Sequence, residues 1–233
     1  MKRYAISDIH GNHQTFLRAL DDIQLSPSDQ LYLLGDYVDR GPDSRGVINT
    51  IFELENKGYQ LQYITGNHEQ YMLTALREHD EEYLQHWLNS GGYATMDSYR
   101  VSGEDYHQDL HQHLQWMTSL PFYIELEDYL LVHAGINFSS IRPLEDLESL
   151  VMIRRWYKNI NYQWLGKKQV IHGHTPINET TMLAQTNPAQ HPFPVYNIDG
   201  GCFMDRAGFG HLAVFDMDLR SFKRYENVDQ VVV

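Results

Sequence analysis

Short apolar runs recur along the chain, and each of them ends in a cluster of polar residues. The runs occupy residues 4–6, 31–34, 61–64, 129–132 and 170–171, and the clusters that follow them are rich in Gly, Asp, Asn and His. Apolar runs of this length are typical of strands that are buried in a sheet. The pattern therefore predicts a series of buried strands, each followed by a polar loop.

Two helical patterns separate the first three runs. Apolar side chains recur at helical spacing over residues 13–23 and again over residues 47–54. Asp43 and Ser44 can cap the second helix, and Gly58 follows its end. The alternation of strand and helix predicts an α/β fold that begins with parallel pairing. Because ligands of such sheets bind at the carboxyl ends of the strands, we expect the loops there to form a site.

The rest of the chain is expected to complete one domain over residues 1–233. Residues 70–120 have a mainly helical and exposed pattern, broken at residues 89–92, which predicts an inserted cap beside the site. Residues 195–225 alternate between apolar and polar, with Gly208, Gly210 and Asp218 at turns. This alternation predicts antiparallel strands that complete a second sheet. His107, His111 and His113 are expected on a solvated helix face.

Composition and charge narrow the class of protein. Hydrophobic residues make up 42% of the chain and charged residues 21%, which is typical of a globular protein. The formal net charge of −13 disfavours nucleic acid as a partner, and no apolar run is long enough for a membrane span. Cys202 is the single cysteine, and the residues before Asp8 are too few and too polar for a signal peptide. We expect a cytoplasmic protein.

The polar clusters contain the ligand types that divalent metals prefer. Aspartate and neutral histidine bind borderline metals, and the two oxygens of Asp36 can bridge a pair of ions. Asp8 and His10 can face the same metal if the chain between them turns, and Asn67 offers a neutral carbonyl oxygen. His133 and His174 can complete a second site. Two metals held in this way would clamp a phosphate and acidify a water molecule.

Five motifs of the sequence resemble those of the calcineurin-like metallophosphoesterases. They are Asp8-Ile9-His10-Gly11, Gly35-Asp36-Tyr37-Val38-Asp39-Arg40-Gly41, Gly66-Asn67-His68-Glu69, His133-Ala134-Gly135 and Gly173-His174-Thr175-Pro176. The second motif resembles the serine/threonine protein phosphatase branch, particularly its small bacterial and bacteriophage lambda-type members. The resemblance implies a two-sheet β-sandwich flanked by helices, a four-layer αββα arrangement with the metals at its edge.

The same resemblance implies a role for each site residue. Asp8, His10 and Asp36 would hold the first metal. The second metal would be held by Asp36, Asn67, His133 and His174. His68 would donate a proton to the leaving group, and Asp39 would orient His68.

Two arginines and Asn67 are expected to contact the substrate phosphate. Arg40 matches the family motif, and its planar fork suits a phosphate. Arg154 or Arg155 would supply the second guanidinium, with Arg154 the better match to the family. The last motif lacks a second histidine ligand, as in the protein phosphatase branch.

These features predict a metal-dependent phosphatase that acts on phosphoprotein, at Ser, Thr or Tyr, or on a small phosphorylated substrate. A symmetrical diadenosine tetraphosphate hydrolase is the alternative, with adenosine bound near the 70–120 segment. A non-catalytic binding module is a third hypothesis, disfavoured because every expected ligand position is filled. Manganese is the expected metal, although iron, zinc, nickel or magnesium also suit these ligands.

Overall fold

Two β-sheets form the centre of the molecule in a computed structural model that describes residues 1–77, 81–100 and 106–229. The first sheet has the strand order β3-β2-β1-β8-β9 and the second has the order β4-β5-β6-β7. The strands of the first sheet are β1 (Arg3–Ile6), β2 (Gln30–Leu33), β3 (Gln60–Tyr63), β8 (His211–Asp216) and β9 (Ser221–Glu226). Those of the second are β4 (Tyr123–Glu125), β5 (Tyr129–Val132), β6 (Gln169–His172) and β7 (Val195–Asn197).

Each sheet combines parallel and antiparallel strands. In the first, β1, β2 and β3 are parallel, whereas β8 runs antiparallel to β1 and β9 antiparallel to β8. In the second, β5, β6 and β7 are parallel and β4 is antiparallel to β5. The expectation that the C-terminal antiparallel strands complete the second sheet was wrong for β8 and β9, because their hydrogen bonds join the first sheet through β1.

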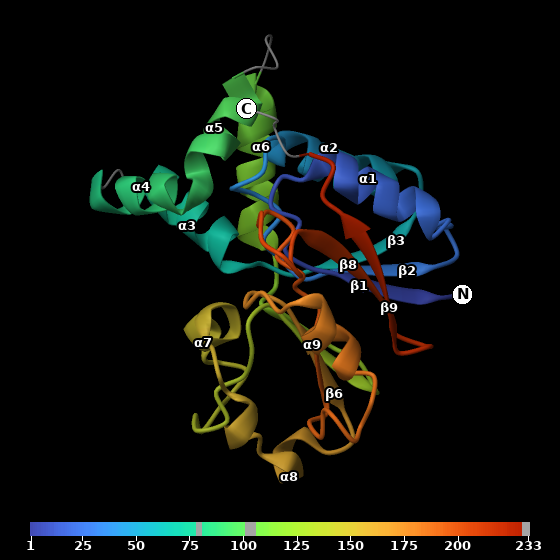
Figure 1. Ribbon diagram of the computed structural model, residues 1–233. Coiled ribbons are helices and arrows are strands. Elements are labelled where there is room, and N and C mark those ends of the chain that lie inside the picture. Colours follow the sequence, from blue (N-terminus) through green and yellow to red (C-terminus); the bar gives the residue numbers. More distant parts are fainter. Residues whose placement is uncertain (78–80, 101–105, 230–233) are drawn as a thin grey trace.

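Helices cover the outer face of each sheet, so the layers follow the order helix, sheet, sheet, helix (Figure 1). The first sheet carries α1 (His13–Asp22), α2 (Ser44–Asn56), α3 (Asn67–Arg77), α4 (Glu81–Trp87), α5 (Tyr93–Arg100) and α6 (Tyr106–Ser119). The second carries α7 (Leu147–Met152), α8 (Tyr162–Leu165) and α9 (Glu179–Ala184). Within the described residues, no helix is both long and apolar enough to cross a bilayer.

Local sequence explains where the first helices begin and end. The Asp43 carboxylate accepts a hydrogen bond from the backbone N–H of Gly46 at 2.7 Å and so caps α2, as predicted. After α2 the chain turns at Gly58, whose φ of 83° is easily adopted only by glycine. In α1, Phe16, Ala19 and Leu20 are buried against the first sheet. The predicted α/β pattern at the start of the chain is therefore confirmed.

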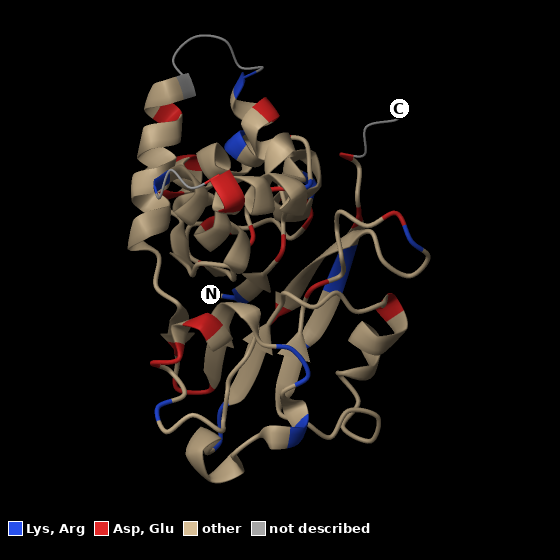
Figure 2. Cartoon of the chain, turned by 90° about the vertical axis from the view of Figure 1, so that its left-hand side faces the viewer, with Lys and Arg blue, Asp and Glu red and all other residues tan. Residues whose placement is uncertain are grey.

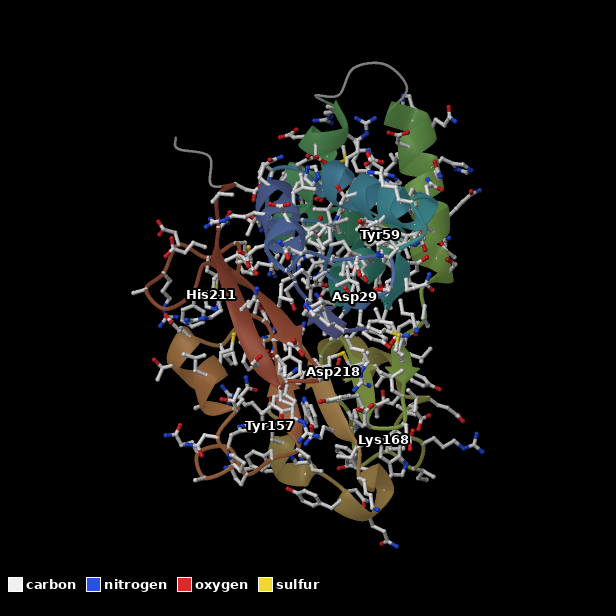
Figure 3. All side chains as sticks on the ribbon, turned by 90° about the vertical axis from the view of Figure 1, so that its right-hand side faces the viewer. Asp29, Tyr59, Tyr157, Lys168, His211 and Asp218 are labelled. Atoms are coloured by element: carbon white, nitrogen blue, oxygen red, sulfur yellow. The ribbon has the colours of Figure 1, made fainter. Side chains whose placement is uncertain are left out.

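A continuous apolar layer joins the two sheets. Ala5, Tyr32 and Phe215 of the first sheet pack with Leu131 and Ile171 of the second. At one end of this layer, the Arg3 guanidinium donates two hydrogen bonds of 2.9 Å to Asp128 and a third, of 2.8 Å, to Asp218. Asp218 lies at the tip of the β8–β9 turn (Figure 3). This packing fixes the position of the strand ends, where the polar loops begin.

Lysine and arginine residues are distributed over both halves of the molecule, among more numerous acidic residues (Figure 2). This distribution agrees with the strongly negative net charge.

Candidate metal centre

Six polar side chains from both sheets meet at one edge of the sandwich. Each comes from a loop or helix start that follows the carboxyl end of a strand: β1, β2 and β3 in the first sheet, β5 and β6 in the second. All six side chains are buried. They are Asp8, His10, Asp36, Asn67, His133 and His174. The structure therefore brings together all the residues that the sequence proposed as metal ligands.

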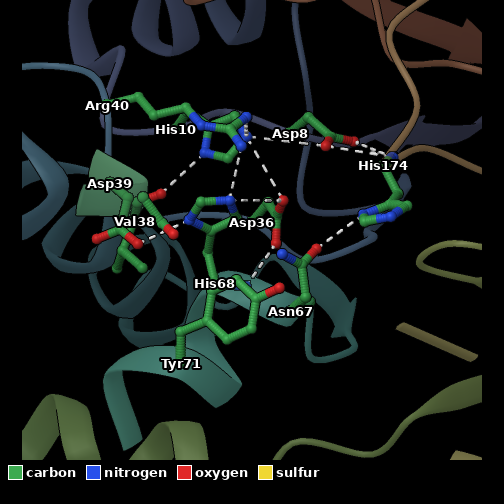
Figure 4. Close-up of polar contacts among 12 residues, drawn as sticks. Asp8, His10, Asp36, Val38, Asp39, Arg40, Asn67, His68, Tyr71 and His174 are labelled. Carbon is green, nitrogen blue, oxygen red and sulfur yellow. Dashed lines mark hydrogen bonds and ion pairs between the residues drawn. The ribbon is translucent and has the colours of Figure 1, made fainter. Parts of the chain in front are cut away.

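Asp36 stands at the middle of this group (Figure 4). Its Oδ2 lies 3.5 Å from His10 Nε2, and its Oδ1 lies 3.4 Å from His133 Nε2. One carboxylate thus faces two separate imidazoles with its two oxygens, which is the geometry that a bridging ligand needs. Asp8 Oδ1 lies 3.9 Å from the same His10 nitrogen. Asn67 Oδ1 lies 3.0 Å from His133 Nε2 and 2.8 Å from His174 Nδ1.

Hydrogen bonds at Nδ1, on the side away from Asp36, orient two of the imidazole rings. His10 Nδ1 lies 2.9 Å from the carbonyl of Val38, and His133 Nδ1 lies 2.7 Å from the carbonyl of Leu34. Each ring donates its Nδ1–H to that carbonyl, so its Nε2 faces Asp36, on the side where a metal would bind. This is the arrangement by which proteins commonly fix metal-binding histidines.

The donor set fits a pair of divalent cations. The ligand atoms of Asp36, His133 and His174 lie within 4.8 Å of one another, as do those of His10, Asp36 and His68. Two carboxylates, three imidazoles and one amide oxygen form a mixed oxygen and nitrogen set, which suits borderline metals. Among the described residues, His174 Nε2 is a buried nitrogen with no hydrogen-bond partner. Cations bound here would polarise a phosphoryl oxygen and lower the pKa of a water molecule.

Burial and mutual charge strongly perturb the ionisation of this cluster. Burial raises the pKa of Asp8 and lowers that of His10. Burial also opposes the charged form of His133, but the carboxylates of Asp36 and Asp8 outweigh it and raise the pKa to about 10. For His174, burial and the nearby His133 lower the pKa to about 3. A cationic His133 thus partly offsets the charge of the carboxylates.

The backbone at this edge is bent into an unusual conformation. Six non-glycine residues of the site have a positive φ, between 49° and 73°, a region that L-amino acids seldom adopt. They are Asp8, His10, Asp36, Asp39, Arg40 and His174. Conformations of this kind cluster at functional sites.

Glu69 is a supporting residue whose role the sequence did not reveal. Its Oε2 accepts hydrogen bonds from the backbone N–H groups of Asp36, at 2.8 Å, and Gly66, at 2.9 Å. Its Oε1 accepts from Tyr37 at 2.8 Å and from Val38 at 3.3 Å. Burial and the charge of Asp36 raise the pKa of Glu69 to about 7 despite these donors. A single carboxylate therefore holds the loop that carries Asp36.

His68 and Asp39 form a buried pair beside the ligands. His68 Nδ1 lies 2.7 Å from Asp39 Oδ2, and both side chains are almost fully buried. Asp39 also accepts hydrogen bonds from Trp87 Nε1 at 3.0 Å and from Thr95 Oγ1 at 2.7 Å. Trp87 is the last residue of α4 and Thr95 lies in α5. The helical segment formed by α3, α4 and α5 therefore clamps the carboxylate that faces His68. No pattern in the sequence indicated this clamp.

Arg40 lies across the same edge. Its Nη1 is 2.8 Å from His10 Nε2 and its Nη2 is 2.8 Å from His68 Nε2. The guanidinium stacks on Phe203, with its carbon 4.1 Å from the ring centroid. Its backbone N–H donates to the carbonyl of Gly91 at 3.2 Å, and a Cβ on Gly91 would lie 2.7 Å from Arg40. Only glycine therefore allows the helical segment to approach this closely.

A cleft of about 380 Å³, which we name the phosphate cleft, opens beside these groups. Arg40, Asn67, His68 and Arg154 line it, together with His174. Of the two arginines that the sequence offered, the structure places Arg154 in this wall, with its Nη1 3.1 Å from Thr175 Oγ1. Both arginines are exposed, but Arg155 is not among the residues that line the cleft. A guanidinium, an amide and an imidazole thus converge where a phosphate can bind.

A four-layer αββα fold that gathers carboxylates, imidazoles and an amide at one sheet edge defines the metallophosphoesterase class. The calcineurin-like phosphoesterase family model matches residues 1–215, and the chain belongs to that family. The resemblance stated from the motifs is therefore confirmed, and with it the expectation of a hydrolase.

Known relatives agree with this class. A symmetrical bis(5'-nucleosyl)-tetraphosphatase of Nitrosomonas europaea is 34% identical over 186 residues, covering 72% of this chain and 62% of that protein. The chain therefore spans less than two thirds of the length of that relative, and 44% of its counterpart in Chromobacterium violaceum, which is 28% identical. A protein serine/threonine phosphatase of Saccharomyces cerevisiae has a similar fold, with a TM-score of 0.64 at 15% identity, covering 100% of this chain and 82% of that one.

Proposed function

We propose that the protein is a metal-dependent hydrolase of dinucleoside polyphosphates. It would hydrolyse diadenosine tetraphosphate with one water molecule and release two molecules of ADP. The observation that carries the proposal is the likeness to relatives named as symmetrical tetraphosphatases, at up to 34% identity over more than half of the chain, combined with the assembled site. The comparisons favour this activity, which the sequence offered as an alternative, over phosphoprotein hydrolysis.

The side chains of the site have complementary tasks in this reaction. Asp8, His10, Asp36, Asn67, His133 and His174 would hold two divalent ions, with manganese the first candidate. Arg40 and Arg154 would neutralise the phosphate oxygens, which a planar guanidinium binds well. As an imidazolium, His68 would give its Nε2 proton to the bridging oxygen that leaves with ADP, and Asp39 would orient the ring by accepting a hydrogen bond from Nδ1.

A substrate panel tests the proposal. The purified protein, supplied with Mn²⁺, is assayed on diadenosine tetraphosphate, a phosphoserine peptide, a phosphotyrosine peptide and an aryl phosphate, with products separated by ion-exchange chromatography. We expect diadenosine tetraphosphate to have the highest kcat/KM and ADP to be the single product. Faster turnover of either phosphopeptide would refute the proposal in favour of phosphoprotein hydrolysis. AMP and ATP as products would show that cleavage is asymmetrical.

A further inference from the structure

A second cavity, larger than the phosphate cleft, lies between the helical segment and α7. Its volume is about 730 Å³, and its walls come from α3, α4, α7 and the residues just before β4. Aromatic side chains are prominent in these walls, and we name the space the ring cavity after them. The rings belong to Tyr71, Tyr83, His86 and Phe122.

The ring cavity adjoins the phosphate cleft. Asn67, Tyr71 and Met152 line both of them. The Tyr71 ring forms the shared wall, with its centroid 5.6 Å from that of His68 on one side and 4.8 Å from that of His86 on the other. The Tyr71 hydroxyl lies 3.3 Å from the sulfur of Met152. A group attached to a phosphate beside His68 would therefore lie next to the ring cavity, with the Tyr71 ring between the two spaces.

The two spaces differ in charge. Arg40 and Arg154 line the phosphate cleft, whereas the side chains of fixed charge around the ring cavity are Glu82 and Glu148. The carboxylates of Glu82 and Glu148 repel phosphate groups, but they can accept hydrogen bonds from an uncharged N–H group. Aromatic walls, for their part, bind planar rings by stacking. The ring cavity is thus suited to an uncharged, nitrogen-rich ring and unsuited to additional phosphates.

We infer that the ring cavity binds a nucleobase of the dinucleoside polyphosphate, on the side of the leaving nucleotide. The inference rests on the proposed function and adds a location for the base to it. Phosphates remain between the arginines, while the base passes Tyr71 and stacks among the aromatic side chains. The helical segment then has a binding task besides its clamp on Asp39, because α3 and α4 supply three of the four rings.

Two variants of opposite character test this assignment. Tyr83→Ala removes a ring from the wall of the cavity. Thr74→Trp, at another residue of the wall, fills part of the cavity with an indole ring. Each should raise the KM for diadenosine tetraphosphate by roughly tenfold, since stacking on an aromatic side chain contributes an affinity of that order. The inhibition constant of orthophosphate, which binds at the metals, should stay within about twofold. Tyr162→Ala is the matched control, because Tyr162 is 56% exposed, close to the 54% of Tyr83, and lines neither space.

The outcomes separate the inference from the proposed function. If the wild type releases ADP and both variants keep the wild-type KM, the ring cavity does not bind the base, and the proposed function stands. If the variants weaken orthophosphate as much as diadenosine tetraphosphate, the changes act through the metal centre and the inference is wrong. If the wild type hydrolyses a phosphopeptide and not diadenosine tetraphosphate, both proposals fall.

Discussion

His68 borders the candidate metal ligands, and its Nδ1 pairs with Asp39, which lies outside that set. Its Nδ1 faces Asp39 at 2.7 Å and its Nε2 faces Arg40 at 2.8 Å, whereas the nearest oxygen of Asp36 is 3.9 Å away. We therefore predict that His68→Ala keeps its metals and lowers kcat by about 10²–10⁴-fold, the usual contribution of a general acid.

Metal content by elemental analysis, measured beside steady-state kinetics, checks this prediction. Asp36→Asn is the comparison variant, because it replaces the carboxylate that faces both imidazole groups, and it should lose metal as well as activity. Equal metal loss in the two variants would show that His68 is a ligand.

The two neighbouring arginines provide a matched pair of substitutions. Both are exposed, but Arg154 lines the phosphate cleft and Arg155 does not. Arg154→Ala should lower kcat/KM by about 10–100-fold, because a hydrogen bond to a charged group contributes about 1.5–3 kcal/mol. Arg155→Ala should change kcat/KM by less than about threefold. The reverse order of effects would assign the phosphate contact to Arg155.

At the scale of elements, α4 and α5 support chemistry that takes place on another loop. Trp87 donates to both oxygens of Asp39, at 3.0 and 3.1 Å. Trp87→Phe keeps most of the buried ring and removes this donor, so kcat should fall about 10-fold, as is usual for a residue that orients a catalytic group.

Trp164→Phe is the control for this substitution, since Trp164 is 40% exposed. Metal content and melting temperature are measured for both proteins. A fall in kcat that is accompanied by metal loss and by a lower melting temperature would show that Trp87 acts only through the stability of the fold.

His113 joins three helices rather than facing solvent, so the expectation of a solvated face was wrong for this residue. Its ring lies 2.6 Å from the Tyr99 hydroxyl in α5 and 3.1 Å from Asn49 Oδ1 in α2. Burial and Arg45 lower its pKa to about 4, from a model-compound value of 6.5, while Asp109 opposes the shift. The unfolded chain therefore protonates His113 at a higher pH than the folded protein does.

It follows that the stability contributed by neutral His113 is complete above about pH 6.5 and is lost as the pH falls toward 4. The free energy of unfolding should fall by about 3 kcal/mol over this range because of His113. Urea unfolding of the wild type and of His113→Gln between pH 4 and 7 measures it, because the variant should show a shallower dependence. His111→Gln, at an exposed position of the same helix, should follow the wild type. Parallel curves for all three proteins would contradict the prediction.

At the scale of the whole molecule, the candidate metal centre draws its residues from both sheets. Asp8, His10 and Asp36 extend from the first sheet, whereas His133 and His174 extend from the second. Bound cations should therefore stabilise the whole fold. Removal of the cations with a chelator should lower the melting temperature by about 5–10 °C, if they were present at about a hundred times their dissociation constant.

Differential scanning calorimetry with and without the chelator measures this shift. Asp36→Asn should respond much less than the wild type, because its ligand set is incomplete. Equal shifts in the two proteins would place the stabilising cation elsewhere.

The sequence predicted the parts of the structure that local patterns determine. Buried strands followed by polar loops were visible in it, and parallel pairing then placed Asp8, Asp36 and Asn67 together. The location of β8 and β9 was missed, because an alternating hairpin does not show which sheet edge it joins. The tasks of Glu69 and Trp87 were missed for a related reason, since their partners lie on other segments and only the assembled fold brings them into contact.

The left-handed backbone at the site has an evolutionary consequence. Such a conformation costs an L-residue about 1–2 kcal/mol, and glycine and asparagine adopt it more readily. An aspartate codon becomes one for either of them by a single nucleotide change. At Asp8, Asp36 or Asp39, that change would relieve backbone strain while it abolished turnover, so a lineage freed from selection for hydrolysis would keep its architecture and lose its chemistry first.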